Sequence, residues 1–161
     1  MTLTRAETEA ASDAYLAVHH RKAWPELADL FAEDASYEDP FFGRVEGREA
    51  IRAFLTKSMT GLEEWSFPIQ WVNVAEGRVV SHWLNRLPGE RQGGGFFEFP
   101  GVSMIHYRPD GTIGAQMDLY ARMRALQVIG EGKSPFVERS VARLRALSEP
   151  LVMAIHRRVA R

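Results

Sequence analysis

The stretch LADLFAEDASYEDPFFGRVEGREAIRAFL, residues 27–55, combines two helical patterns with a turn between them. Residues 23–31, with Pro25 near a helix start, carry apolar side chains at the spacing of one helix face. Residues 47–59 place an apolar stripe opposite a charged one, as an amphipathic helix does. The stretch therefore predicts a short helix, a turn and a longer helix.

The turn is formed by Asp39 and Pro40. A residue before proline is held in an extended conformation, and Gly43 then allows the chain to reverse. The carboxylate is set among three aromatic residues, Tyr37, Phe41 and Phe42. Asp39 is therefore either an ordinary turn residue or a base held against an apolar cavity.

The flanking sequence predicts one more helix and four strands. TRAE, residues 4–7, has capping-box spacing, so a helix is expected to run to about His20. Later the apolar period changes to two, which predicts strands in residues 65–74, 76–87, 94–108 and 111–123. Pro68 lacks an amide hydrogen, so the first of these strands is expected at an edge or at a bulge. Helices followed by an antiparallel meander indicate an α+β fold, with the helices on one face of a sheet.

Composition limits the partners that the chain is expected to have. Its 161 residues are 45% hydrophobic, which suits one domain with its own core. The formal net charge is -1, so no overall field favours nucleic acid or an anionic membrane. No apolar run approaches the roughly 20 residues of a membrane span. The absence of cysteine fits a reducing compartment, and we expect a cytoplasmic protein.

Residues 131–161 differ from residues 1–130, and we expect them to form a C-terminal helical extension of the domain. The extension holds seven Lys and Arg against three Glu, whereas residues 1–130 hold thirteen against eighteen acidic residues. Its apolar residues recur every three or four positions. We expect it to pack on the acidic body or on a partner subunit. An exposed basic face that binds a membrane surface or nucleic acid is the alternative.

The central stretch resembles the NTF2-like superfamily, in particular its SnoaL-like and ketosteroid-isomerase-like members. The matching positions are Leu30-Phe31-Ala32, Asp34-Ala35, Asp39-Pro40, Gly43, Gly47, Ala50-Ile51 and Phe54. The resemblance implies an NTF2-like cone, in which a strongly curved, mainly antiparallel sheet wraps around three N-terminal helices. Such cones enclose a mainly apolar cavity and commonly form homodimers. No single chemistry follows, because the superfamily includes isomerases, cyclases, dehydratases, epoxide hydrolases and non-catalytic proteins.

Asp39 and Tyr15 are the first candidate catalytic residues. Burial beside aromatic rings raises the pKa of a carboxyl group and makes it a better base for an acidic C–H. In ketosteroid isomerases the base is the Asp of a matching Glu-Asp-Pro, so the resemblance implies that role for Asp39. A first-helix tyrosine supplies the oxyanion hydrogen bond there, which implies that role for Tyr15. Where those enzymes use a second, protonated Asp, this chain has Ser103. A plain turn residue and a core tyrosine are the alternatives.

Asp118 is the second carboxylate candidate. In SnoaL-type polyketide cyclases and limonene-epoxide-hydrolase-like proteins an Asp of the closing strand is the acid or base, and residues 116–120 resemble that place. A carboxylate within a strand is costly unless it is exposed or used, so a solvent-facing or paired Asp is the alternative.

His82 is a candidate proton shuttle if its face of the strand points inward. If that face points outward, Ser81, Trp83 and Asn85 line the cavity instead. His19 and His20 are interpreted as surface residues.

The remaining expected contacts are with a substrate. We expect a small hydrophobic ligand to be bound by Tyr37, Phe41, Phe42, Trp83, Phe99, Ser103 and Tyr120. The sequence lacks the His and Cys spacings of metal sites and has no P-loop, so we expect neither a metal nor a cofactor.

The function hypothesis is cofactor-independent proton transfer on a hydrophobic carbonyl compound of polyketide-, steroid- or terpenoid-like type. Isomerisation, cyclisation and dehydration all fit the candidate residues. The alternative is a non-catalytic, dimeric NTF2-like module that binds a ligand or a protein, for which the helical extension after Ile129 is the motivating feature.

Overall fold

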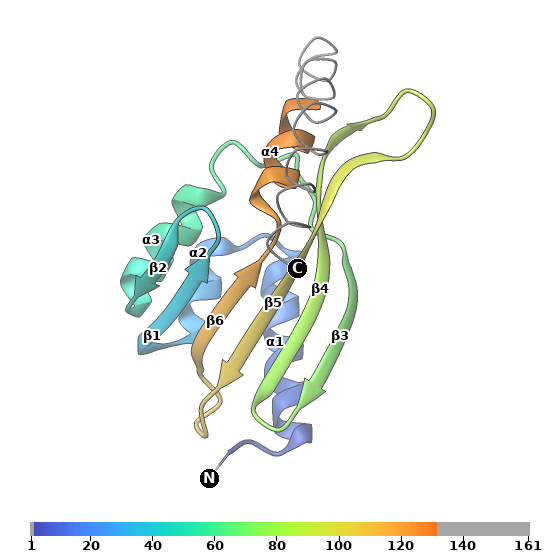
Figure 1. Cartoon of the computed structure of the whole chain (residues 1–161). Helices are drawn as coiled ribbons and strands as arrows, with labels where there is room; N and C mark the ends of the chain where they lie inside the picture. Colours follow the sequence, from blue (N-terminus) through green and yellow to red (C-terminus); the bar gives the residue numbers. More distant parts are fainter. Residues whose placement is uncertain (1, 132–161) are drawn as a thin grey trace, which may run out of the picture.

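The computed structural model describes residues 2–131 of the chain (Figure 1). Residues 2–131 form four α-helices, one 3-10 helix and six strands. In chain order the elements are α1 (Arg5–His20), α2 (Trp24–Leu27), the 3-10 helix η1 (Ala28–Leu30), β1 (Phe31–Asp39), β2 (Gly43–Glu46), α3 (Arg48–Ser58), β3 (Ile69–Ala75), β4 (Arg78–Glu90), β5 (Phe96–Tyr107), β6 (Ile113–Leu119) and α4 (Arg122–Glu131). No helix within residues 2–131 combines the length and the apolar character that crossing a membrane requires.

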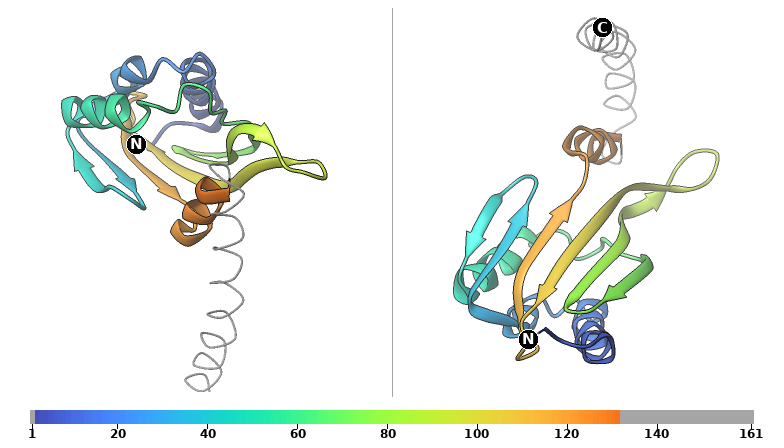
Figure 2. Two further views of the ribbon diagram at one scale, coloured as in Figure 1. Left: turned by 90° about the horizontal axis from the view of Figure 1, so that it is seen from above. Right: turned by 60° about the horizontal axis from the view of Figure 1, so that its bottom comes forward.

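All six strands form one sheet in the order β2-β1-β6-β5-β4-β3. β1 and β6 run parallel, and every other neighbouring pair is antiparallel. Figures 1 and 2 show a curved sheet with α1, α2 and α3 on one face, and α4 beyond the end of β6. The predicted α+β class, with three N-terminal helices on a curved, mainly antiparallel sheet, is confirmed.

Two hydrophobic clusters hold the layers together. The larger one joins the N-terminal helices to the sheet and is centred on fully buried Phe31, Ile51 and Ile113. The smaller one packs α4 against β4 and β5 and contains Ala125 and Val128 of α4, Leu87 of β4 and Phe99 of β5. Side chains on the concave face of the sheet that belong to neither cluster, such as Ser81 and Trp83, line a cavity.

The local signals explain most of the helix boundaries. Thr4 and Glu7 form the predicted capping box, with the Glu7 amide donating to Thr4 Oγ1 at 3.3 Å and the Thr4 amide donating to Glu7 Oε2 at 2.8 Å. Gly47, at φ 89°, precedes α3, and its amide donates to the Ala35 carbonyl at 2.8 Å. That bond ties the start of α3 to β1.

The chain between the two predicted helices forms a β-hairpin. Its turn lies where Asp39-Pro40 and Gly43 predicted it, but the two strands that flank the turn, β1 and β2, were not predicted. Phe31 starts strand β1, which pairs with β2 so that Asp39 lies opposite Gly43. Gly43, at φ 77°, supplies the left-handed conformation that the reversal needs. The exposed pair Glu33-Asp34 interrupts the alternation of buried residues in β1 and hides its period.

The later strands follow the prediction with two differences. β3 is an edge strand, as Pro68 predicts, but it starts only at Ile69 and carries a register shift before Trp71. β6 ends at Leu119, and helix α4 occupies Arg122–Glu131, where the prediction continued a strand to residue 123. The proposed extension, residues 131–161, lies outside the described residues apart from Glu131.

The buried hydroxyl of Thr8 joins α1 to the β3–β4 turn. Thr8 is fully buried, donates to the Thr4 carbonyl at 2.8 Å and accepts from the Gly77 amide at 2.9 Å.

Thr8→Val keeps the shape of the side chain and leaves the Gly77 amide without an acceptor, so it should lower the free energy of unfolding by about 1–3 kcal/mol. Thr56 also bonds the carbonyl four residues earlier but is exposed. Urea unfolding of Thr56→Val should therefore show a change of at most about 0.5 kcal/mol. Equal losses in the two variants would contradict this account.

Candidate functional site

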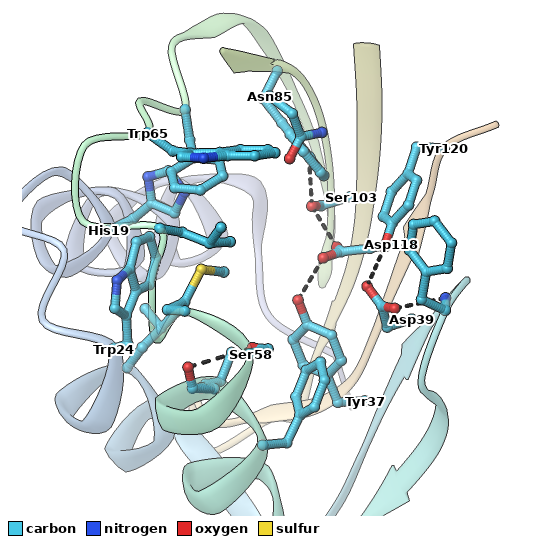
Figure 3. Close-up of a pocket in the computed structure, with 18 of the residues that line it drawn as sticks. His19, Trp24, Tyr37, Asp39, Ser58, Trp65, Asn85, Ser103, Asp118 and Tyr120 are labelled. Carbon is cyan, nitrogen blue, oxygen red and sulfur yellow. Dashed lines mark hydrogen bonds between the residues drawn. The ribbon is translucent and has the colours of Figure 1, made fainter. Parts of the chain in front are cut away.

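A cavity of about 350 Å³ lies between the N-terminal helices and the concave face of the sheet (Figure 3). Aromatic side chains make up much of its wall, and the polar groups are gathered at a few points. All seven residues expected to contact a substrate line it; that they bind one stays a prediction. They are Tyr37, Phe41, Phe42, Trp83, Phe99, Ser103 and Tyr120.

The orientation of β4 decides which of its side chains reach the cavity. Ser81, Trp83 and Asn85 line it, which is the alternative that the sequence left open. His82 lies on the other face, where its ring stacks on Trp71 with centroids 5.6 Å apart. The structure therefore does not bring His82 to Asp39 or Asp118, because successive side chains of a strand point to opposite faces.

Asp118 on β6 is the buried acidic centre of the site. Its Oδ1 accepts hydrogen bonds from Ser103 Oγ at 2.6 Å and Gln116 Nε2 at 3.2 Å. Its Oδ2 accepts a hydrogen bond from the Tyr37 hydroxyl. Three strands, β1, β5 and β6, thus converge on one carboxylate (Figure 3).

The direction of these bonds follows from an indole that can only donate. Trp83 Nε1 donates to Ser103 Oγ at 2.8 Å, so the Ser103 hydroxyl hydrogen is available for Asp118. Ser103 stands where the resemblance to ketosteroid isomerases leads one to look for a second aspartate. In this chain the Ser103 hydroxyl donates to Asp118 and so orients that carboxylate.

Burial raises the pKa of Asp118 above that of an ordinary aspartate. The hydrogen bonds from Ser103, Tyr37 and Gln116 act in the opposite direction, and the charge of Asp39 adds to the increase. Burial, followed by the charge of Asp118, also raises the pKa values of Tyr15 and Tyr37. Both side chains therefore stay protonated phenols and can donate hydrogen bonds.

Asp39 is occupied by its own turn. Its Oδ1 accepts from the backbone amides of Phe41 at 2.8 Å and Phe42 at 3.1 Å. Its Oδ2 accepts from the Tyr120 hydroxyl at 2.9 Å. The carboxylate borders the cavity, but its hydrogen bonds hold the two phenylalanines that form the cavity rim. The turn role is what the structure shows; a base role stays untested.

Tyr15 lies on the same cavity as Asp39 and Asp118. Its hydroxyl oxygen accepts from Gln116 Nε2 at 3.1 Å. Within residues 2–131 no hydrogen bond uses the Tyr15 hydroxyl hydrogen. A free donor that already faces a cavity is suited to an oxygen that gains charge during a reaction.

Sequence reasoning missed Gln116 as a bridge between the tyrosines and Asp118, and it wrongly assigned His19 to the surface. His19 lines the cavity and stacks on Tyr15 with centroids 6.1 Å apart. Burial, and then the charge of His20, lowers its pKa to about 4, so it is neutral near pH 7. The spacing of four residues from Tyr15 was the available signal, because such residues share a helix face.

Metal ligands are not grouped in this part of the chain. Among residues 2–131 there is no set of three or more His, Asp or Glu side chains placed to hold a metal ion.

Comparison with known proteins identifies relatives in sequence and in fold. A family model described as SnoaL-like domain matches residues 13–115. A search of curated proteins found none that matches this sequence.

Three similar solved structures illustrate the range of proteins with this fold. A candidate ketosteroid isomerase from Kribbella flavida DSM 17836 is 22% identical, with 73% of this chain and 80% of that chain covered and a TM-score of 0.57. A candidate polyketide cyclase from Xanthomonas campestris pv. campestris is 21% identical, with 77% and 98% covered and a TM-score of 0.60. SalBIII, an epoxide hydrolase/cyclase-like enzyme with a role in pyran ring formation in polyether salinomycin, is 15% identical, with 74% and 94% covered and a TM-score of 0.59. At such low identities these likenesses show the fold alone.

Gly101 makes room for the indole that orients Ser103. A Cβ at Gly101 would lie 2.5 Å from the Trp83 ring, whereas one at Gly114 would meet only the side chain of Arg108, at 3.1 Å. Gly101→Ala should displace the indole, change the near-ultraviolet circular dichroism and cost about 1–3 kcal/mol of stability. Gly114→Ala, the control, should leave the tryptophan signal intact. An unchanged signal in Gly101→Ala would show that Trp83 is not held against Gly101.

Proposed function

Because the chain belongs to the family of SnoaL-like domains, we propose that it is an enzyme that moves a proton on a small hydrophobic carbonyl compound without a cofactor. The observation that carries this proposal is the buried Asp118 carboxylate at an aromatic cavity, with a raised pKa and three hydrogen-bond donors. A carboxylate in that setting is a stronger base than an exposed one and stays fixed in direction.

The chemical step assigns one role to each group. Asp118 takes the proton from a carbon next to the substrate carbonyl, and the C–H electron pair moves into the carbonyl to give an enolate. The free hydrogen of Tyr15 then bonds the enolate oxygen, which needs no rearrangement of the site. Returning the proton to another carbon gives isomerisation. Attack of the enolate on a second carbonyl gives cyclisation, with the proton returned to the new alkoxide.

Asp39 receives a supporting role in this proposal. Its two amide bonds hold Phe41 and Phe42, which are 41% and 63% exposed although they border the cavity. Exposed aromatic rings at a cavity rim suit the entry of an apolar compound.

The test compares the same chemical change at the two carboxylates. With 2-tetralone as the probe, the protein should accelerate exchange of the ketone's α-hydrogens with D₂O, measured by proton NMR. Asp118→Asn should slow the catalysed exchange by about 10²–10⁴-fold, because it removes the base. Asp39→Asn keeps an oxygen for the Phe41 and Phe42 amides, so it should lose less than about tenfold. A larger loss in Asp39→Asn than in Asp118→Asn would reverse the assignment.

The pH dependence of the same exchange provides a separate prediction. A base must be ionised to act, so the rate should fall as the pH drops through the pKa of Asp118. Because burial raises that pKa, the acidic limb should lie above the ordinary aspartate value of about 3.9. Asp118→Asn should remove this limb from the residual rate. A limb at or below the ordinary value would mean that Asp118 is not the base.

A non-catalytic, dimeric ligand-binding module is the second candidate. Large apolar side chains on the outer face of the sheet favour it, since Trp71 is 50% and Leu119 46% exposed. In addition, Ile129 of α4 reaches the cavity wall, so the helix partly closes the site. Binding of 2-tetralone without any acceleration of exchange would favour this module over the enzyme.

A further inference from the structure

Asn85 is a buried polar side chain that the structure leaves without a hydrogen bond. Its residue is 8% exposed, and its Nδ2 is buried with no partner. Within the described part of the chain, no hydrogen bond uses either polar atom of its side chain. Native proteins rarely bury an amide in this way unless water, an ion or a ligand completes it.

The amide of Asn85 faces the same cavity as Asp118. Asn85 is one of the β4 residues on the cavity wall, and Figure 3 shows it beyond Ser103 with its amide directed inward. Ser81, four residues earlier on β4, pairs across the sheet with Ser103, whose hydroxyl bonds Asp118. Four residues of strand span roughly 13 Å, so Asn85 lies at a second, distant point of the cavity.

The wall between these two polar points is aromatic. Trp83 and Tyr120 have ring centroids 6.3 Å apart, and Phe99 and Tyr120 5.8 Å apart. Trp65 lies 6.5 Å from Phe99 and continues this wall. This wall of the cavity is therefore polar at Asp118, aromatic in between and polar again at Asn85.

We propose that Asn85 binds a second oxygen of the substrate, which is accordingly a bicyclic or longer apolar compound with an oxygen function toward each end. This rests on the proposed function, in which the first oxygen is the reacting carbonyl near Asp118. The second oxygen is a carbonyl or a hydroxyl, because an amide can donate to either and accept from a hydroxyl. Rotation of the amide about its last side-chain bond turns whichever of its two groups is needed toward that oxygen.

Two naphthols form a matched pair of probes. The hydroxyl of 2-naphthol mimics an enol and can occupy the Asp118 end, whereas 2,6-dihydroxynaphthalene adds one oxygen at the far end. The protein should bind the diol about tenfold more tightly than 2-naphthol, the gain from roughly one net hydrogen bond. Isothermal titration calorimetry measures both affinities.

Asn85→Leu should bring the two affinities within about twofold of each other, mainly by weakening the diol. Asn85→Ala, which adds no bulk, should do the same, and Asn73→Leu on the exposed edge strand β3 should keep the diol preference. Without ligand, Asn85→Leu should melt at the same temperature as the wild-type protein or higher, because it removes an unpaired buried amide.

The outcomes separate this inference from the proposed function. The role of Asn85 is overturned if the wild-type protein binds the diol no more tightly than 2-naphthol. It is also overturned if Asn85→Ala still binds the diol more tightly. A lower melting temperature in both Asn85 variants, with Asn73→Leu unaffected, overturns it too, because Asn85 would then be a structural residue. If Asp118→Asn binds 2-naphthol as tightly as the wild-type protein does, the proposed function is contradicted. The melting temperatures of the Asn85 variants would still show whether Asn85 is a structural residue.

Discussion

The Asp118 carboxylate and its donors are the constraint on which the site depends. A buried carboxylate is tolerated only when its oxygens are hydrogen-bonded, and here the donors come from β1, β5 and β6. β6 must therefore lie between β1 and β5, as the strand order shows. The parallel β1–β6 pair brings Tyr37 opposite Gln116, beside Asp118, and the antiparallel β5–β6 pair brings Ser103 opposite Asp118. The hydrogen bonds to Asp118 therefore depend on this strand order, and they in turn hold β1, β5 and β6 together.

The two carboxylates of the cavity differ because of their local backbones. Asp39 ends β1 next to a turn, where free amides of Phe41 and Phe42 are within reach of its side chain. Asp118 lies inside a strand whose own amides are used by the sheet, so only side chains can satisfy it. The hydrogen bonds of Asp39 therefore hold the rim of the cavity in place. Those of Asp118 leave a hydrogen-bonded carboxylate on the cavity wall. The sequence places Asp39 before Pro40 and Asp118 within a strand, but it does not record which hydrogen-bond donors reach each carboxylate.

The sequence predicted the features that a few neighbouring residues determine, and it did not predict those that depend on contacts between distant parts of the chain. The capping box at Thr4, the amphipathic α3 and the edge position near Pro68 follow from a few neighbouring residues, and they were predicted. β1 was missed because Glu33 and Asp34 break its alternation, and because β6, the partner on its other side from the hairpin strand β2, lies about 80 residues further along the chain. In the site, alternation limited β4 to two faces but could not choose between His82 and the Ser81–Asn85 face. The unpartnered state of Asn85 depends on what surrounds it in space, which no sequence pattern records.

The most direct test of the central claim is the titration of Asp118 itself, followed by carbon-13 NMR of the aspartate carboxyl groups and assigned with Asp118→Asn. Asp110 provides an internal comparison, because its hydrogen bonds to Thr112 lower its pKa. The account predicts that the Asp118 carboxyl titrates above the ordinary aspartate value of about 3.9 and well above Asp110. A midpoint at or below the ordinary value would show that the donors outweigh burial, and it would contradict Asp118 as the base of the cavity.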